Sequence, residues 1–295
     1  MTHHLAFMQR AIALSENGLG RTAPNPIVGA LIVATDGSVI AEGFHDRHKS
    51  PDHAEVVALK IAGDRAKGAT MYVTLEPCNH TGTTGPCTNA IIDAGIATLV
   101  YAVTDPNPVA SGGAAALKAA AIEVVAGVGQ EEAEYANRAW LTKIIKGRPF
   151  ITWKVAATLD GKVAALDGTS KWITNEASRA DVQKVRRSVD AIMVGTQTVI
   201  ADDPHLVPRD GKEGANPLRI VCGTQELPKG AQVFDSAAPT KVIASKDLEV
   251  VAAELLATGV NHILLESVFL PNQALPSHPI FLYPIIKSLW HLSDF

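Results

Sequence analysis

Short apolar runs alternate with helical segments along almost the whole chain, and this rhythm constrains the fold more than any other feature. Apolar runs of this kind, separated by helices, are typical of sheets covered by helices. The sequence therefore predicts an α/β fold. In the first half we expect strands at residues 27–33, 39–44, 70–75, 98–102 and around Val124, and helices at residues 5–15, 54–62, 88–94, 113–121 and 131–146.

A second domain is expected to begin near residue 147. Gly147-Arg148-Pro149 follows the first half, and the strand-and-helix rhythm then begins again. The length of 295 residues, at roughly 150 residues per domain, also favours two domains. In the second half we expect strands at residues 150–156, 191–195, 218–222, 241–245 and 262–266, and helices at residues 176–188 and 248–258. The predicted domains are residues 1–146 and 147–266, followed by a divergent tail at 267–295.

Composition and charge argue against several kinds of partner. The net charge of −4 and the aromatic fraction of 5% give no support to a nucleic-acid partner. The longest apolar runs stay below the roughly 20 residues that a membrane-spanning helix needs, and the N-terminal residues lack a secretory pattern. Three cysteines suit ligands or free thiols better than a disulfide framework. We expect a soluble cytoplasmic protein that acts on a small molecule, with no nucleic-acid or membrane partner.

Three residues have the identity and spacing of zinc ligands: His53, Cys78 and Cys87. One imidazole and two thiolates leave one corner of a tetrahedral Zn²⁺ free for water, as in catalytic sites, whereas structural sites are closed by a fourth protein ligand. Glu55 follows His53 by two residues, where a carboxylate can move protons between that water and a leaving amine. The pattern H-x-E followed by P-C is typical of zinc deaminases. The sequence therefore predicts a hydrolytic deaminase with Glu55 as its catalytic acid and base.

Each of these residues alone has a plainer explanation. His53 could cap a helix or lie in the core, Glu55 could be a solvated acid in a first helical turn, and the cysteines could be inert core residues. Their combination and order favour catalysis. His80 is a rival fourth ligand, which would close the site and leave Glu55 without a role.

Two further features indicate which deaminase the first half resembles. Eight residues separate Cys78 from Cys87, where cytidine-type deaminases usually have two, and residues 22–29 read TAPNPIVG. With the sequences TLEPC at 74–78 and DPNP at 105–108, the chain resembles the bifunctional deaminase–reductase family of riboflavin biosynthesis, from near its N-terminus to about Glu266. The resemblance implies a three-layer cytidine-deaminase-like domain, followed by an α/β domain similar to dihydrofolate reductase.

The resemblance also implies a substrate for the first domain. The family removes the 2-amino group of 2,5-diamino-6-ribosylamino-4(3H)-pyrimidinone 5′-phosphate, and Asn25 matches a position expected to hydrogen-bond the ring. An Asx turn between two prolines accounts for Asn25 equally well. Thr83 stands where the family usually carries a basic residue suited to phosphate, and the stretch 45–53 looks one residue longer. The basic residues of that stretch could replace the missing contact, or the stretch could be a surface loop.

Other functions remain open at this point. A zinc deaminase of another nucleobase or nucleoside would use the same ligands. A binding module with a structural zinc would use them without chemistry.

For the second domain the resemblance implies reduction of the ribosyl side chain to ribityl with NADPH. It rests on the segments 154–162, 170–174 and 195–204. The implied NADPH contacts are Ala156, Trp172, Thr198 and Asp202, and the implied substrate contacts are Ser170, Arg186, Leu206, Arg209 and Glu266. Without the resemblance, the two arginines would be interpreted as surface charges and Trp172 as a core aromatic. The resemblance also suggests a homodimer.

The chain departs from the family after Glu266. The family continues with a glycine-rich turn whose backbone N–H groups hold the cofactor phosphates. This chain instead reads SVFLP at 267–271, and residues 267–295 contain no glycine and four prolines. The tail resembles a truncated or replaced ending. We therefore expect an incomplete reductase domain that lacks the phosphate turn and the closing strands of its sheet.

We predict that the reductase step is impaired. Purified protein given NADPH and the aminouracil ribosyl phosphate should oxidise NADPH slowly, because the cofactor phosphates lose their backbone donors. The absorbance of NADPH measures this rate, and ammonia release by the first domain is the internal reference. Normal turnover of the aminouracil ribosyl phosphate would contradict the prediction.

Overall fold

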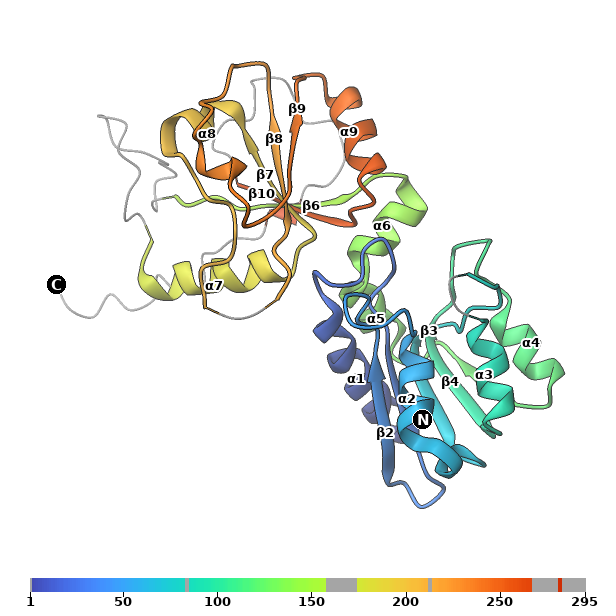
Figure 1. Ribbon diagram of the computed structural model, residues 1–295. Helices are drawn as coiled ribbons and strands as arrows, with labels where there is room; N and C mark the ends of the chain where they lie inside the picture. The colour runs from blue at the N-terminus through green and yellow to red at the C-terminus, as the bar shows by residue number, and fades with distance from the viewer. Residues whose placement is uncertain (1, 83–84, 158–173, 212–213, 267–280, 283–295) are drawn as a thin grey trace. The chain divides into compact units, whose positions relative to one another are not determined.

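The computed structural model describes residues 2–82, 85–157, 174–211, 214–266 and 281–282. The chain forms two compact units, Met1–Gly147 and Arg148–Phe295, and each unit is built around its own sheet (Figure 1). Within the described residues, every helix is too short or too polar to cross a membrane. The fold is α/β in both halves, as the sequence predicts.

The first unit is a five-stranded sheet with the order β2-β1-β3-β4-β5. β1 is antiparallel to β2 and to β3, whereas β3, β4 and β5 are parallel. The strands are β1 (Gly29–Val33), β2 (Val39–Phe44), β3 (Thr70–Leu75), β4 (Thr98–Val103) and β5 (Glu123–Ala126), and the helices are α1 (Thr2–Ser15), α2 (Ala54–Ala62), α3 (Cys87–Asp93), α4 (Gly113–Ala119), α5 (Gln130–Ala136) and α6 (Arg138–Lys146), with short 3₁₀ turns η1 (Glu16–Gly18) and η2 (Gly63–Ala66). The chain β3-α3-β4-α4-β5 continues the strand-and-helix rhythm of the sequence.

Helices cover both faces of this sheet. α1 packs against β1 and β3 and contacts α5, while α2 packs against β1 and β2 and contacts α3, which in turn contacts α4 (Figure 1). Two glycines permit this close packing: a Cβ on Gly29 would collide with the Ala11 carbonyl of α1, and a Cβ on Gly43 would collide with the Ala54 carbonyl of α2. The glycine at 43 therefore allows β2 to support the beginning of α2.

The expected single helix at 131–146 is wrong, because the chain breaks at Asn137 into α5 and α6. The Asn137 side chain accepts a hydrogen bond from the Ile27 amide (3.3 Å) and donates one to the Ile27 carbonyl (3.2 Å). An amide side chain thus satisfies the backbone just before β1, where the sequence predicts strand. The helix is thus interrupted at Asn137, whose side chain binds the segment that precedes β1.

The second unit is a sheet with the order β11-β6-β10-β7-β8-β9, in which every recorded pair is parallel. Its elements are β6 (Phe150–Trp153), α7 (Glu176–Arg187), β7 (Ala191–Gly195), α8 (Thr196–Asp202), β8 (Leu218–Cys222), η3 (Gln232–Phe234), β9 (Thr240–Ile243), α9 (Leu248–Ala257), β10 (His262–Leu265) and β11 (Phe281–Leu282). Alternate residues of β7 enter different cores: Ile192 and Val194 pack in one cluster, and Ala191 and Met193 in another. A central strand buried on both faces explains the continuous apolar run at 191–195.

Three details of the second unit differ from the sequence-based expectations. β6 ends at Trp153 instead of 156, and α8 begins directly after β7 where no helix was expected. The sheet was expected to gain no strand from the tail, yet Phe281 and Leu282 pair with β6 through their backbone. The remainder of the predicted tail and the segment 158–173 lie outside the described residues.

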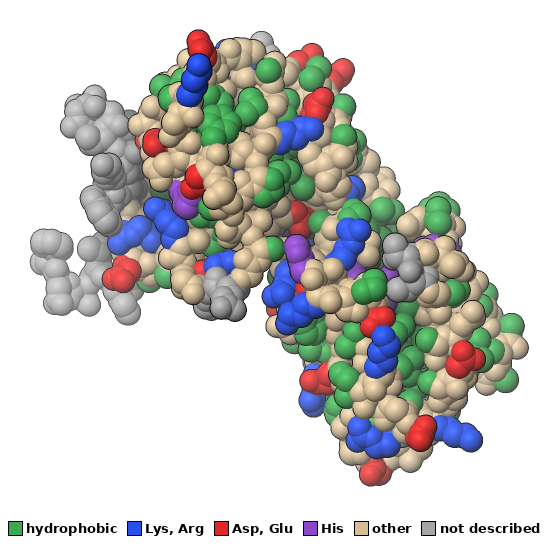
Figure 2. All heavy atoms as spheres, viewed as in Figure 1, with side chains coloured by type: hydrophobic (Ala, Val, Ile, Leu, Met, Phe, Trp, Pro, Cys, Tyr) green, Lys and Arg blue, Asp and Glu red, His purple; other side chains and the backbone are tan. Residues whose placement is uncertain are grey.

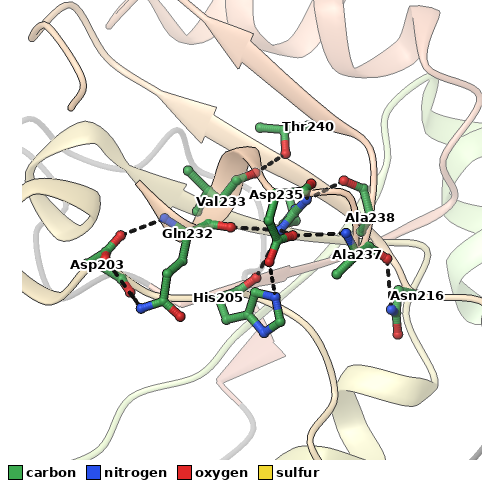
Figure 3. A network of polar contacts seen from close by, with 10 residues as sticks. Asp203, His205, Asn216, Gln232, Val233, Asp235, Ala237, Ala238 and Thr240 are labelled. Carbon is green, nitrogen blue, oxygen red and sulfur yellow. Dashed lines mark hydrogen bonds and ion pairs between the residues drawn. The ribbon is translucent and has the colours of Figure 1, made fainter. Parts of the chain in front are cut away.

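One fully buried arginine holds the loops beside β8. Arg219 donates through Nη1 to the Gln232 carbonyl (3.1 Å) and to Oδ1 of Asp235 (2.8 Å), and through Nη2 to the carbonyls of Asp235 (2.6 Å) and Ala238. Its hydrogen bonds lower the pKa of Asp235 to about 2. Asp235 also pairs with His205 at 2.5 Å, as Figure 3 shows. The arginine therefore joins β8 to η3 and to the segment after α8.

We predict that Arg219→Met lowers the free energy of unfolding of the second unit by about 3 kcal/mol, because several buried carbonyls lose a charged donor. Hydrogen exchange of the β8 amides measures this loss. Lys229→Met, on an exposed residue, should change it by less than about 0.5 kcal/mol. Equal protection of β8 in the two variants would show that the buried arginine contributes no net stability.

Candidate active site

Two of the predicted site residues, His53 and Glu55, lie at the start of α2. His53 is the N-cap residue of α2, with an extended backbone (φ −75°, ψ 163°) that turns the chain from the preceding loop into the helix. Glu55 lies in the first helical turn and is only 4% exposed. A carboxylate in a first turn is favoured by the helix dipole, yet a buried one is unusual without a function.

The two cysteines come from two later segments, one after β3 and one at the start of α3. Cys78 follows β3, which ends at Leu75, and Cys87 is the first residue of α3. Nδ1 of His53 lies 3.6 Å from Sγ of Cys78 and 3.3 Å from Sγ of Cys87. The three ligand atoms all lie within 4.8 Å of one another. Side chains from three separate segments therefore converge on one point.

This geometry fits a zinc ion. Bond lengths of about 2.3 Å to sulfur and about 2.0 Å to nitrogen, at tetrahedral angles, separate a sulfur from a nitrogen by about 3.6 Å. The two observed S–N distances agree with that separation to within a few tenths of an ångström. Both thiols are free of disulfides and buried, so they can act as thiolate ligands. His53, Cys78 and Cys87 can hold zinc with one corner left for solvent.

The ionisable groups around this point shift one another's pKa values. Hydrogen bonds from Cys87 and from His53 lower the pKa of the Cys78 thiol to about 4, whereas the neighbouring Cys78 sulfur and burial raise the pKa of Cys87. Burial raises the pKa of Glu55, and the His53 charge opposes that shift. A buried carboxyl with a raised pKa, in contact with the ligand group, is well suited to accept and return a proton.

A pocket of about 350 Å³ opens over these residues. It lies entirely within the first unit, and its size is within the usual range of small-molecule sites. Its lining includes Pro24, Asn25, His45, Arg47, His53, Glu55, Glu76, Cys78, His80, Asp105, Asn107 and Trp140. Polar groups from five segments therefore face one cavity, whose lining includes Glu55 and two of the predicted ligands, His53 and Cys78.

The structure places Asn25 in this pocket, where its Nδ2 lies 3.1 Å from Nε2 of His45. His45 is in turn held by the Asp52 carbonyl at 2.8 Å from Nδ1. Burial lowers the pKa of His45, so the ring favours its neutral form. His80 lines the pocket too, but it is not part of the ligand group within the described residues. The group thus has three members, and Glu55 stays beside it.

Glu76 and Asp105 are pocket residues to which the sequence analysis gave no role. Glu76 is buried, and its carboxylate accepts hydrogen bonds from the amides of Asp105 (3.2 Å) and Ala114 (2.9 Å). Asp105 accepts one from the Asn107 amide (2.8 Å). Glu76 thereby joins the end of β3 to the loop after β4 and to α4. Its position next to Pro77-Cys78 was the available sequence signal.

The expected reductase residues gather at one edge of the second sheet. β6, β10 and β7 are parallel neighbours, so Ala156, Thr198 and Glu266 all follow the carboxyl ends of adjacent strands. Ligands of open α/β sheets bind at that edge, which agrees with an NADPH site there. Asp202 ends α8, which starts from the same edge. Trp172, Ser170 and Thr83 lie outside the described residues.

Two of the expected substrate contacts bind each other. Arg186 donates to both carboxylate oxygens of Glu266 at 2.7 Å, and both side chains are 9% exposed. Burial raises the pKa of Glu266, but the Arg186 hydrogen bonds together with the charges of Arg186, Lys154 and Arg209 outweigh it, and the net pKa is lowered. Leu206 is buried, and Arg209 is exposed while its charge also stabilises the Glu266 carboxylate. The guanidinium fork of Arg186 therefore faces a carboxylate in the described structure.

Two family models together match most of the chain. The cytidine and deoxycytidylate deaminase zinc-binding region matches residues 1–103, and the RibD C-terminal domain matches residues 149–268. The riboflavin biosynthesis protein RibD of Aquifex aeolicus is 46% identical over 269 residues, which is 90% of this chain and 75% of that protein. RibD of Mycobacterium tuberculosis is 47% identical, over 83% of this chain and 74% of the relative.

Solved structures agree with this match. A diaminohydroxyphosphoribosylaminopyrimidine deaminase/5-amino-6-(5-phosphoribosylamino)uracil reductase from Thermotoga maritima has a TM-score of 0.84 and 39% identity, covering 90% of this chain and 81% of that one. RibD of Acinetobacter baumannii has a TM-score of 0.82 and 37% identity with the same coverage. The two family models fall in the two units, and the zinc-binding region at 1–103 includes His53, Cys78 and Cys87. The chain belongs to the RibD family.

Proposed function

We propose that the first unit deaminates the 2-amino group of 2,5-diamino-6-ribosylamino-4(3H)-pyrimidinone 5′-phosphate in riboflavin biosynthesis. The observation that carries this proposal is the buried Glu55, hydrogen-bonded to Cys87 of the His/Cys/Cys group, in a pocket that His53 and Cys78 also line. Membership of the RibD family and the deaminase/reductase activity of the Thermotoga maritima relative support the substrate. A purely structural zinc would require neither the vacant corner nor the buried acid.

The protein residues divide the chemical work. His53, Cys78 and Cys87 would hold zinc, which would supply a water of lowered pKa. The Glu55 carboxyl, whose pKa is raised by burial, would take up a proton at its oxygen and return it to the departing amino nitrogen. Asn25 hydrogen-bonds the pyrimidine ring from the pocket wall. The buried floor keeps bulk water away from the developing charges.

We assign the second step to the second unit. NADPH, which supplies the hydride, is held by Ala156, Trp172, Thr198 and Asp202, and the ribosyl substrate by Ser170, Arg186, Leu206, Arg209 and Glu266. The described members of both sets that follow β6, β7 and β10 share one edge of the sheet, and this supports the assignment. Arg186 binds Glu266 in the described structure, whereas Arg209 is exposed.

We also propose domain bounds, a cellular location and an oligomeric state for the chain. The deaminase domain is residues 1–146, the reductase domain residues 147–266 and the tail residues 267–295. A reducing cytoplasm would keep Cys78 and Cys87 as thiols, and we propose that the protein works there. The family resemblance favours a homodimer, and sedimentation velocity of the purified chain measures its state.

We predict that Glu55→Gln keeps the zinc but lowers ammonia release by about 10³-fold, because an amide cannot carry the proton. Metal content and ammonia release from the diaminopyrimidine ribosyl phosphate, with cytidine as a second substrate, measure the two properties. Glu131→Gln, on an exposed glutamate of the same unit, is the matched control and should leave both unchanged. Ammonia release undiminished in Glu55→Gln would refute the assignment.

We further predict that stripping the metal with a chelator abolishes ammonia release and that added Zn²⁺ restores it. Cys87→Ser should weaken zinc retention, since a hydroxyl replaces a thiolate ligand. Metal analysis alongside the ammonia assay follows both effects. Full activity in metal-free protein would rule out a zinc-dependent reaction.

A further inference from the structure

The deaminase pocket contains one permanent cation within its described lining, Arg47. The other charged or titratable members are His45, His53, Glu55, Glu76, Cys78, His80 and Asp105, none of which is a lysine or arginine. Figure 2 shows basic side chains and histidines gathered at the end of the first unit where α1 ends and α2 begins. A substrate that carries a phosphate needs a cationic partner in or beside this cavity.

The backbone around Arg47 is held in a defined turn. The amide of His45 donates to the Val28 carbonyl (3.1 Å), and the amides of Lys49 and Ser50 donate to the Asp46 carbonyl (both 3.0 Å). These bonds anchor both ends of the short segment that carries Arg47. Residues 47–49 are exposed, as in a surface loop, and their backbone forms a hydrogen-bonded turn beside the pocket.

The neighbouring cations Arg21 and Lys49 are paired with a carboxylate, whereas Arg47 has no such ion pair among the described residues. Nη2 of Arg21 lies 2.9 Å from Oδ2 of Asp46, and Nζ of Lys49 lies 4.0 Å from the same atom. Arg47 instead donates through Nη1 to the Ala23 carbonyl (2.9 Å). A guanidinium has five N–H donors, so this contact orients the group and leaves most of its donors for a ligand.

The Arg47 guanidinium also lies close enough to His45 to affect its charge. Its charge is one of the causes that lower the pKa of His45, after burial and the charge of His53. His45 contacts Asn25, which we have placed at the pyrimidine ring. Arg47 is therefore near the group that holds the ring, in the same pocket as the Glu55 carboxyl.

From these observations we infer that Arg47 is the specificity-determining residue that binds the 5′-phosphate of the deaminase substrate. This inference rests on the proposed function. The guanidinium, oriented by the Ala23 carbonyl, would present its remaining donors to two phosphate oxygens. Arg47 thus selects a phosphorylated ribosyl pyrimidine over the corresponding nucleoside and takes no part in proton transfer.

The test compares two substrates on the zinc-loaded full chain: the diaminopyrimidine ribosyl 5′-phosphate and its dephosphorylated nucleoside. Arg47→Ala should raise KM for the phosphorylated substrate by about 10- to 100-fold, with kcat nearly unchanged and with KM for the nucleoside unchanged. Arg47→Lys should recover part of the loss, because lysine offers the charge without the fork. Lys49→Ala, outside the pocket lining, is the matched control and should behave as the wild type.

Two results would overturn the inference. One is an unchanged KM for the phosphorylated substrate in Arg47→Ala, and the other is an equal loss for both substrates, which would indicate a structural role. A calorimetric titration with ribose 5-phosphate separates this inference from the proposed function. If the wild type releases no ammonia, the function fails, yet weaker ribose 5-phosphate binding by Arg47→Ala still supports the anion site, and equal binding refutes it.

Discussion

The first unit depends on bringing one imidazole and two sulfurs close enough to share an ion. His53 lies at the beginning of α2, Cys78 after the central strand β3, and Cys87 at the beginning of α3. The sheet order places β3 beside β1, and α2 and α3 contact each other on one face. The close packing of α2 on Gly43 therefore bears directly on the ligand distances.

Burial gives the same residues their chemistry. Glu55 is ionisable yet almost fully enclosed, and that enclosure raises its pKa. Such a group is costly to bury unless it interacts with a charge, and the neighbouring ligand group provides that interaction. The lining of the same pocket also includes Asn25 and Arg47, whose side chains offer hydrogen-bond donors.

Sequence reasoning succeeds where chemistry fixes residue type and spacing. The spacing of His53, Cys78 and Cys87 predicts the group that the fold brings together, and the strand-and-helix rhythm predicts both α/β units. The catalytic role of Glu55 stays a prediction. Sequence reasoning fails where a distant partner decides the local structure. Nothing near Asn137 announces that its side chain binds the backbone of Ile27, 110 residues away.

Likewise, the pairing of Arg186 with Glu266 joins residues 80 positions apart. Only the fold brings such groups together.

X-ray absorption at the zinc edge of the purified protein tests the central claim most directly. The account predicts two sulfurs at about 2.3 Å and two lighter ligands at about 2.0 Å, one an imidazole and one exchangeable with solvent. Absence of zinc, or a fourth ligand from the protein, would contradict it.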